Sequence, residues 1–256
     1  MKKKQLAPSV MAIILTALCV VPFLYIFAKS LIVDGSLSLT AYYEVFLAQN
    51  QYLSRFWRSL SLTLCIAAGQ VVVSVLAGYG FAKCKFRGRD TVFFLLMLLM
   101  IMPLQVTLVP NYLMLDEMGL LDTYYALALP MIFAPLGTFI MTQCFKAVPN
   151  DIIEAARLDG CGTMGVILRI ITPMNKSGLV CTMLLSFLDG WNMVEQPIVY
   201  LKNFDSYPLS VGLASALPDD PTIQLVCCVL AAIPPLFLFS YYKKELVEGI
   251  AIGGEK

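Results

Sequence analysis

The sequence contains no histidine among its 256 residues. This absence excludes hydrolytic sites in which an imidazole activates serine or cysteine, and it excludes zinc sites built on histidine. Eight cysteines are present, but none forms a C-x-x-C pair, so the sequence indicates neither a zinc cluster nor a thioredoxin-like motif. The carboxylates and cysteines form no evident catalytic pair, and we therefore expect no metal site and no enzymatic activity.

Charge is also scarce, because only 14% of the residues are charged whereas 59% are hydrophobic. A soluble domain of this length needs more charge to cover its surface. The net charge of +1 provides no overall basic field for binding nucleic acid. The sequence also lacks a G-x-x-x-x-G-K-[ST] loop, so we do not expect the chain to bind ATP. This composition predicts a protein that lies in the membrane and contacts lipid.

Long apolar stretches are what the sequence has in abundance. A helix needs about 20 apolar residues to cross the hydrocarbon core of a bilayer. Five stretches reach this length without a charged residue, and a sixth carries Asp189 and Glu195. We therefore predict an all-α fold, a polytopic bundle of six transmembrane helices in a single domain over 1–256, with an uncleaved first helix. The predicted spans are 8–28, 59–82, 91–113, 123–145, 177–199 and 222–242.

Prolines lie in or near several predicted spans. They predict kinked or broken helices, which a membrane protein tolerates when neighbouring groups satisfy the freed carbonyls. The prolines concerned are Pro22, Pro103, Pro110, Pro130, Pro135, Pro197, Pro234 and Pro235.

The charges of the connecting segments alternate along the chain. Basic residues gather at 2–4, 83–89, 146–176 and 243–244, whereas the intervening segments hold mostly aspartate and glutamate. Because basic loops stay in the cytoplasm, this pattern predicts that both termini and the 146–176 loop are cytoplasmic.

The 146–176 loop contains the signals of a short helix. Pro149 precedes the predicted start, Asp151 can cap it, and Glu154 can reach back three residues later, as in a capping box. Gly160 fits the position just past the helix end, where a positive φ is needed. These signals predict a cytoplasmic helix of about two turns.

The residues of this predicted helix are unusually small. Ala155, Ala156 and Gly160 lack bulky side chains, and the last two share a face at i, i+4 spacing. Small residues let another surface approach the backbone closely. A second short helix is predicted to begin at Thr163 and to run until Pro173.

This loop resembles the cytoplasmic E-A-A-x3-G-x9-I-x-L-P motif of ABC importer permeases. The matching residues are Glu154, Ala155, Ala156, Gly160, Ile170 and Pro173, with Thr172 in place of leucine. Further segments at 36–60, 78–89, 103–123, 191–197 and 247–254 resemble segments of the maltose-type carbohydrate permeases in order and spacing. The resemblance is to the smaller of the two paired permeases of that family.

The resemblance implies a transmembrane domain like that of type I ABC importers, in a bacterial cytoplasmic membrane. It implies a permease subunit that imports a sugar or oligosaccharide together with a second permease, in a heterodimer. It also implies two ATPase subunits, which bind ATP and Mg, and an extracytoplasmic solute-binding protein, whereas this chain binds no cofactor. The residues implied to couple this chain to the ATPase are Glu154, Ala155, Ala156, Asp159, Gly160 and Pro173.

Polar residues in or near the spans are candidates for the solute path. Gln105 and Asn192 carry amides that can hydrogen-bond sugar hydroxyls, and Glu195 lies in the predicted fifth span. The same amides can instead hold helices together. Asp189 and Glu195 are ordinary loop carboxylates if the fifth span ends near Phe187.

Two other classes of protein fit a hydrophobic chain of this length. A secondary transporter or channel needs no ATPase, but it usually shows paired intramembrane charges or inverted repeats, and neither is evident. A membrane-embedded enzyme would have to work without histidine. Recovery of a stoichiometric ATPase with the chain would favour the importer over a secondary transporter or channel, and a neighbouring reading frame with a Walker A loop would weigh against both classes.

Overall fold

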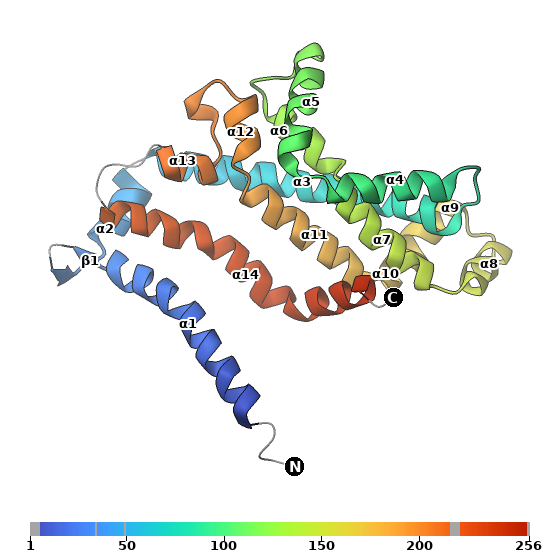
Figure 1. The fold of residues 1–256 in the computed structure, drawn as a ribbon, viewed down its shortest axis with the longest axis horizontal. Coiled ribbons are helices and arrows are strands. Elements are labelled where there is room, and N and C mark those ends of the chain that lie inside the picture. The colour runs from blue at the N-terminus through green and yellow to red at the C-terminus, as the bar shows by residue number, and fades with distance from the viewer. Residues whose placement is uncertain (1–5, 34, 49, 216–220, 255–256) are drawn as a thin grey trace. The chain divides into compact units, whose positions relative to one another are not determined.

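The computed structural model describes residues 6–33, 35–48, 50–215 and 221–254. Helices make up most of this part of the chain, and one short antiparallel hairpin follows the first helix (Figure 1). The predicted all-α class is thus confirmed. The hairpin pairs Ile32 with Leu37 and Val33 with Ser36. The elements, in chain order, are α1 (Leu6–Ser30), β1 (Ile32–Val33), β2 (Ser36–Leu37), α2 (Thr40–Tyr43), η2 (Glu44–Ala48), α3 (Asn50–Lys83), α4 (Arg89–Ile101), α5 (Leu104–Glu117), α6 (Tyr124–Ile132), α7 (Pro135–Ala147), α8 (Asn150–Leu158), α9 (Thr163–Gly165), η3 (Val166–Ile171), α10 (Thr172–Met174), α11 (Lys176–Trp191), α12 (Glu195–Tyr200), η4 (Phe204–Ser206), α13 (Leu209–Ser215) and α14 (Pro221–Gly254).

The chain forms two compact units. The first comprises Met1–Phe56 and Gly212–Pro234, and the second comprises Trp57–Val211 and Pro235–Lys256. In the first unit, the Tyr52 hydroxyl donates a hydrogen bond of 3.4 Å to the Cys227 carbonyl, which links the start of α3 to α14. The second unit holds every candidate site residue that the sequence predicts.

Two apolar clusters form most of the interior of the second unit. One cluster joins α3, α7, α8 and the π-helical segment η3 around the fully buried Met141 and Phe145. The other joins α3, α5, α6 and α12 around Ile66, Leu127 and Tyr200. The first cluster fixes the loop at 146–176 to the ends of α3 and α7.

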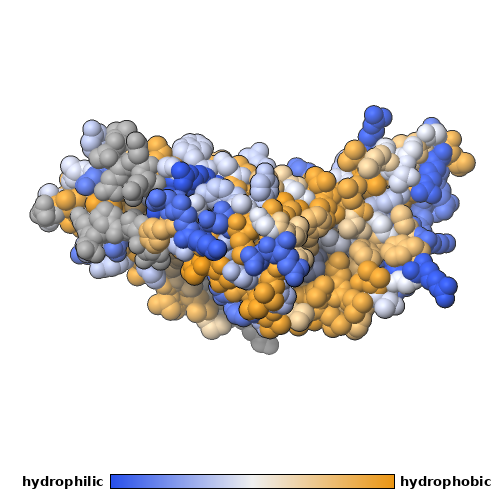
Figure 2. Space-filling view, turned by 90° about the horizontal axis from the view of Figure 1, so that it is seen from above, coloured by the Kyte–Doolittle hydropathy of each residue, from blue (hydrophilic) through white to orange (hydrophobic). Residues whose placement is uncertain are grey.

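Large apolar side chains are also exposed over much of the surface. They cover a broad area of one face, coloured orange in Figure 2. Those on α4 include Phe94, Leu95 and Leu99, each more than half exposed. A soluble monomer rarely exposes apolar patches of this extent, whereas a lipid-facing surface is made of such side chains.

Three helices in the described residues are long and apolar enough to cross a membrane. They are Tyr52–Lys83, Tyr124–Ala147 and Pro221–Val247. The pair Arg89–Ile101 and Leu104–Glu117 makes a fourth if the two count as one broken span, and Ile14–Ser30 is a shorter apolar helix. The count of six spans therefore stays a prediction.

The predicted third and fifth spans are each interrupted in the structure. Residues 91–113 are not one straight helix, because the chain bends by 108° between α4 and α5. Pro103 lacks an amide hydrogen and forces Met102 into an extended conformation, with ψ at 132°. The helix of the predicted fifth span, α11, ends at Trp191 rather than at 199. The next helix, α12, begins only at Glu195.

Candidate functional site

The helix predicted in the cytoplasmic loop is α8, but its start differs from the prediction. It begins at Asn150, with Pro149 in the N-cap position at ψ 141°, and no side chain caps its amides in this described segment. Asp151 lies inside the first turn, so the predicted capping box with Glu154 is wrong. The proline places the chain in an extended conformation directly before the helix, which moves the start ahead of Asp151. A carboxylate in the first turn still interacts favourably with the helix dipole.

The end of α8 agrees with the prediction. Gly160 has φ at +82°, a conformation that L side chains rarely adopt. Its amide donates to the Arg157 carbonyl at 3.0 Å, and the Cys161 amide donates to the Ala156 carbonyl at 2.9 Å. This pair of bonds is the Schellman arrangement, which satisfies carbonyls that a helix end leaves open.

The inner face of α8 is packed against the protein. Ile153 and Ala156 are buried, at 5% and 8% exposure, among Val166, Ile167 and Tyr79 of the first apolar cluster. Ala156 was predicted to share an approachable face with Gly160, and that part of the prediction is wrong. A helix that lies on its own domain must bury one stripe, and Ala156 falls on that stripe with Ile153.

The outer face of α8 is exposed. Glu154, Ala155, Asp159 and Gly160 all lie on the surface, and Leu158 is 89% exposed. Leu158 was not among the site residues predicted from the sequence. Its position could have indicated it, because it is an apolar residue at the end of a short helix, on the side opposite Ile153. A single exposed leucine is common on protein surfaces, so Leu158 is a candidate contact only together with the small residues beside it.

The second helix of the loop begins at Thr163, as predicted. It continues through η3 and α10 to Met174, one residue beyond Pro173. Val166 and Ile171 are fully buried in the first apolar cluster, whereas Pro173 is exposed. The helix therefore forms the seat on which α8 rests, with Pro173 at its surface.

Polar bonds also join α8 to the end of α3. The Lys83 ammonium donates to the Val148 carbonyl at 2.5 Å and to Oδ1 of Asn150 at 2.9 Å. Arg157 donates to the buried Tyr79 hydroxyl at 3.5 Å, a long bond. By its sequence context, Lys83 is predicted only to belong to a basic segment that sets the membrane orientation. In the structure, it ties the first residue of α8 to the last residue of a long membrane helix.

The candidate solute-path residues come together in part. The Gln105 amide on α5 donates to both oxygens of the Glu195 carboxylate on α12, at 2.9 and 3.2 Å. The Asn192 amide instead donates to the Leu188 carbonyl of its own helix, at 3.0 Å, and so ends α11. The pair therefore joins two helices, and its carboxylate is half-buried between them.

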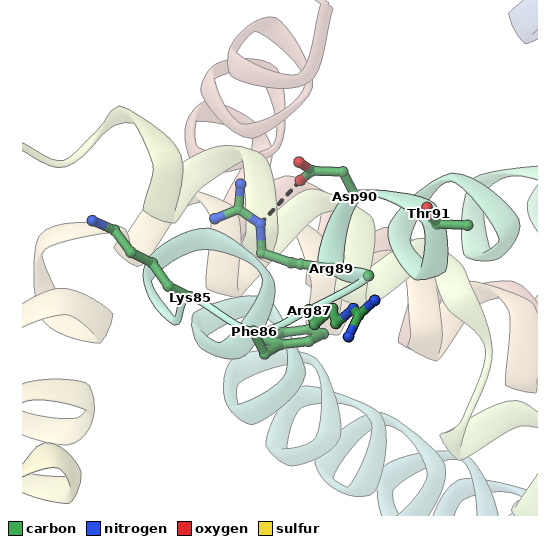
Figure 3. A pocket seen from close by; sticks show the side chains of 7 residues that line it. Lys85, Phe86, Arg87, Arg89, Asp90 and Thr91 are labelled. Carbon is green, nitrogen blue, oxygen red and sulfur yellow. Dashed lines mark hydrogen bonds and ion pairs between the residues drawn. The ribbon is translucent and has the colours of Figure 1, made fainter.

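The basic turn between α3 and α4 forms a shallow hollow. Figure 3 shows that Lys85 and Arg87 point away from each other, while Arg89 turns to Asp90, with Nε 3.0 Å from the carboxylate. Side chains that hold a phosphate converge on it. The divergence favours the interpretation of this segment as a determinant of membrane orientation.

Several known proteins resemble this chain in sequence. The family described as "Binding-protein-dependent transport system inner membrane component" matches residues 70–242, which include α8 and its seat. The arabinooligosaccharides transport system permease protein AraQ of Bacillus subtilis (strain 168) is 29% identical over 223 residues, covering 86% of this chain and 79% of the relative. The lactose transport system permease protein LacG of Rhizobium radiobacter is 28% identical over 208 residues, covering 80% of this chain and 76% of the relative.

A solved structure shares the fold. It is a bacterial ABC transporter involved in the import of the acidic polysaccharide alginate, with a TM-score of 0.82. The match covers 95% of this chain and 96% of that chain at 20% sequence identity. The chain thus has the fold of an ABC importer permease.

Proposed function

Because this chain belongs to the family of binding-protein-dependent transport system inner membrane components, we propose that it is a permease subunit of an ATP-driven importer of a sugar or oligosaccharide. It pairs with a second, larger permease, and the two form the path across the membrane. Two ATPase subunits bind on the cytoplasmic side and hold ATP and Mg, and an extracytoplasmic protein delivers the solute. Both termini and α8 lie in the cytoplasm, as the distribution of basic residues indicates.

The relatives support a sugar as the solute. Their names refer to arabinooligosaccharides and lactose, and the structural neighbour imports alginate. The residues of this chain fit such a solute, because Gln105, Asn192 and Glu195 offer amide and carboxylate groups that exchange hydrogen bonds with hydroxyls.

One observation carries the proposal: α8 is fixed on one face and open on the other. Ile153 and Ala156 anchor it inside the protein, while Ala155, Leu158 and Gly160 face outward. A partner that binds the outer face therefore moves α8 together with the helices on which it packs.

This geometry supports a lever mechanism for transport. Closure of the two ATPase subunits around ATP moves the cleft in which α8 lies. The displacement passes to α3 through Lys83 and to α7 through the apolar cluster. The membrane helices then shift between inward-facing and outward-facing arrangements.

Replacement of Gly160 by aspartate tests this function. A side chain there meets nothing within 4 Å of its Cβ, so it does not disturb the interior, but it adds bulk and charge to the outer face of α8. We expect Gly160→Asp to abolish ATP-dependent uptake while the chain still inserts into the membrane. Uptake in membrane vesicles and the amount of inserted protein measure the two effects.

The matched control is Gly88→Asp. Gly88 has nearly the same φ, +83°, and also has open space around it, but it lies in the turn between α3 and α4. Equal loss of uptake in both variants, or unchanged uptake with Gly160→Asp, would contradict the assignment of α8.

Purification from the native membrane tests the importer against a secondary transporter or channel. We expect an ATPase to be recovered with the chain in stoichiometric amount. Uptake that continues without ATP and without such a subunit would exclude the importer. The thermal stability of the cognate extracytoplasmic binding protein, measured with arabinooligosaccharides, lactose and alginate oligosaccharides, would identify the sugar.

A further inference from the structure

A small polar cavity lies between α3, α7 and α11, away from the Gln105–Glu195 pair. Its polar lining consists of Gln70, Thr182, Ser186 and Asp189. Figure 1 shows the three helices that contribute these residues, and α7 packs along α11. Thr182, Ser186 and Asp189 are spaced at i, i+4 and i+7, so they form one polar stripe along α11.

The hydroxyls of this cavity have no partner. Thr182 and Ser186 are 1% and 3% exposed, and in the described part of the chain neither hydroxyl oxygen makes a hydrogen bond. The same holds for Ser74, which is fully buried on α3 next to the cavity. A buried hydroxyl without a partner is unfavourable, and native proteins almost always satisfy such groups. These serines and threonines therefore do not hold the helices together by hydrogen bonds.

The cavity is narrow in this structure. It is too narrow to admit a free water molecule, so water does not satisfy the hydroxyls either. Gly137 on α7 makes this close packing possible. A Cβ at that position would lie 2.8 Å from Cγ2 of Thr182 and would collide with Oγ of Ser74.

A carboxylate, that of Asp189, lines the cavity. Asp189, in the last turn of α11, is exposed, and among the described residues no basic side chain pairs with it. On the opposite side, the Gln70 amide donates to the Ala134 carbonyl at the break between α6 and α7, at 3.3 Å. Polar groups with no structural partner in a membrane helix mark a path for water or solute.

We propose that this cavity is the contracted form of a hydroxyl-binding section of the solute path. It opens during the transport cycle, and Thr182, Ser186 and Asp189 then exchange hydrogen bonds with the hydroxyls of the solute and with water. The inference deepens the proposed function, on which it rests, by adding a polar section separate from Gln105 and Glu195. Hydroxyl-rich solutes fit it, because both hydroxyl and carboxylate groups accept hydrogen bonds from sugars.

Thiol labelling tests the opening. Ser186→Cys is introduced into the assembled importer in lipid vesicles, treated with aminoethyl methanethiosulfonate, and read by mass spectrometry of the peptide that contains position 186. Native Cys181 and Cys144 lie close to positions 186 and 142, so each is replaced by alanine in the variant that is labelled beside it. Because a minor conformation is populated at about 0.1–10%, labelling during ATP turnover is expected to be about tenfold faster or more than without ATP. Equal rates in the two conditions, in vesicles that still hydrolyse ATP in response to the binding protein, would overturn the inference and leave the proposed function intact.

Thr142→Cys is the control for labelling. Thr142 is fully buried on α7, outside the cavity, and its hydroxyl donates to the Thr138 carbonyl of its own helix at 2.7 Å. Its labelling is expected to stay slow under turnover. Comparable acceleration at position 142 would show general loosening rather than opening of the cavity, and it would also overturn the inference.

Protection by a sugar shows whether the opened cavity binds the solute or only water. Labelling of Ser186→Cys under turnover is measured with the binding protein free of sugar and loaded with arabinotriose, lactose or an alginate oligosaccharide. Labelling that is slower with a loaded binding protein than with the sugar-free one assigns the hydroxyls to the solute. Labelling as fast with every loaded protein as with the sugar-free one assigns them to water alone and overturns the solute part of the proposal.

Thermal unfolding tests the missing hydrogen bonds. Thr182→Val keeps the shape of the side chain and removes a hydroxyl that has no partner, so the melting temperature is expected to stay the same or rise. Thr142→Val removes a hydroxyl that is bonded, and its melting temperature is expected to fall. An equal fall in both variants would show that the Thr182 hydroxyl is bonded at rest, which contradicts the proposal.

Discussion

The α8 region and the cavity between α3, α7 and α11 differ in whether their inward-facing groups are packed and hydrogen-bonded. In the α8 region, apolar side chains such as Ile153 face inward, and the helix end is closed by the bonds at Gly160. In the cavity, the hydroxyls of Thr182 and Ser186 face inward, and neither bonds to any residue that the structure describes. A well-packed and satisfied element resists deformation, whereas an unsatisfied polar interior gains hydrogen bonds when it opens. The comparison indicates a rigid α8 region and a more deformable section within the helix bundle.

A charge under α8 should break the rigid side of this comparison with the largest effect. Ile153→Asp places a carboxylate in the apolar cluster around Val166 and Tyr79, where Arg157, which bonds to the Tyr79 hydroxyl, compensates the charge only in part. A buried charge costs about 3–5 kcal/mol when no partner compensates it, and a partial partner leaves a large share of that cost. We expect a large fall in the melting temperature, measured by thermal unfolding, and loss of ATPase recovery on purification. A melting temperature close to that of the unmodified chain would mean that α8 is not anchored as described.

A methyl group at Gly137 should test the cavity with an intermediate effect. Gly137→Ala places a Cβ against Ser74 and Thr182, and overpacking of this kind costs about 1–3 kcal/mol. The control is Gly80→Ala on α3, where a Cβ has open space and alanine should stabilise the helix by about 0.5–1 kcal/mol. Thermal unfolding of the two variants measures the contrast. A stabilising effect at position 137 would mean that the helices separate there at little cost.

The outer face of α8 should give the smallest change in stability. Leu158 is 89% exposed, so Leu158→Asp should change the free energy of unfolding by no more than about 0.5 kcal/mol. Its binding to the ATPase should weaken by about 2 kcal/mol, or roughly thirtyfold, if the leucine is a central anchor of the interface. Thermal unfolding and the affinity for the purified ATPase separate the two effects. Unchanged affinity would remove Leu158 from the docking surface.

Local residue patterns predicted much of the α8 region. Gly160 was correctly placed at a position that needs positive φ, because such a helix end depends on a few adjacent residues. The capping box failed for a local reason as well, since Pro149 moved the helix start to Asn150. The burial of Ala156 could not be predicted, because both faces of a two-turn helix carry small residues and only the packing partner chooses between them.

The contacts of Gln105, Glu195 and Lys83 could not be predicted, because each joins residues that lie far apart in the chain. Gln105 and Glu195 were each suspected of lining a path, but their direct bond depends on how α5 bends after Pro103 and where α12 begins. Lys83 looked like one of several cytoplasmic basic residues. Its bonds to Val148 and Asn150 exist only because the end of α3 lies beside the start of α8.

The sequence by itself determined that this chain is a helical membrane protein with a short helix, ended by glycine, in the loop at 146–176. It could do so because hydropathy and helix termination act over short stretches of chain. Only the tertiary structure decided which face of α8 is available, and which polar groups are left without partners. Burial and hydrogen-bond satisfaction are properties of neighbours in space, and the neighbours of Thr182 and Ser186 come from helices that lie far apart in the sequence.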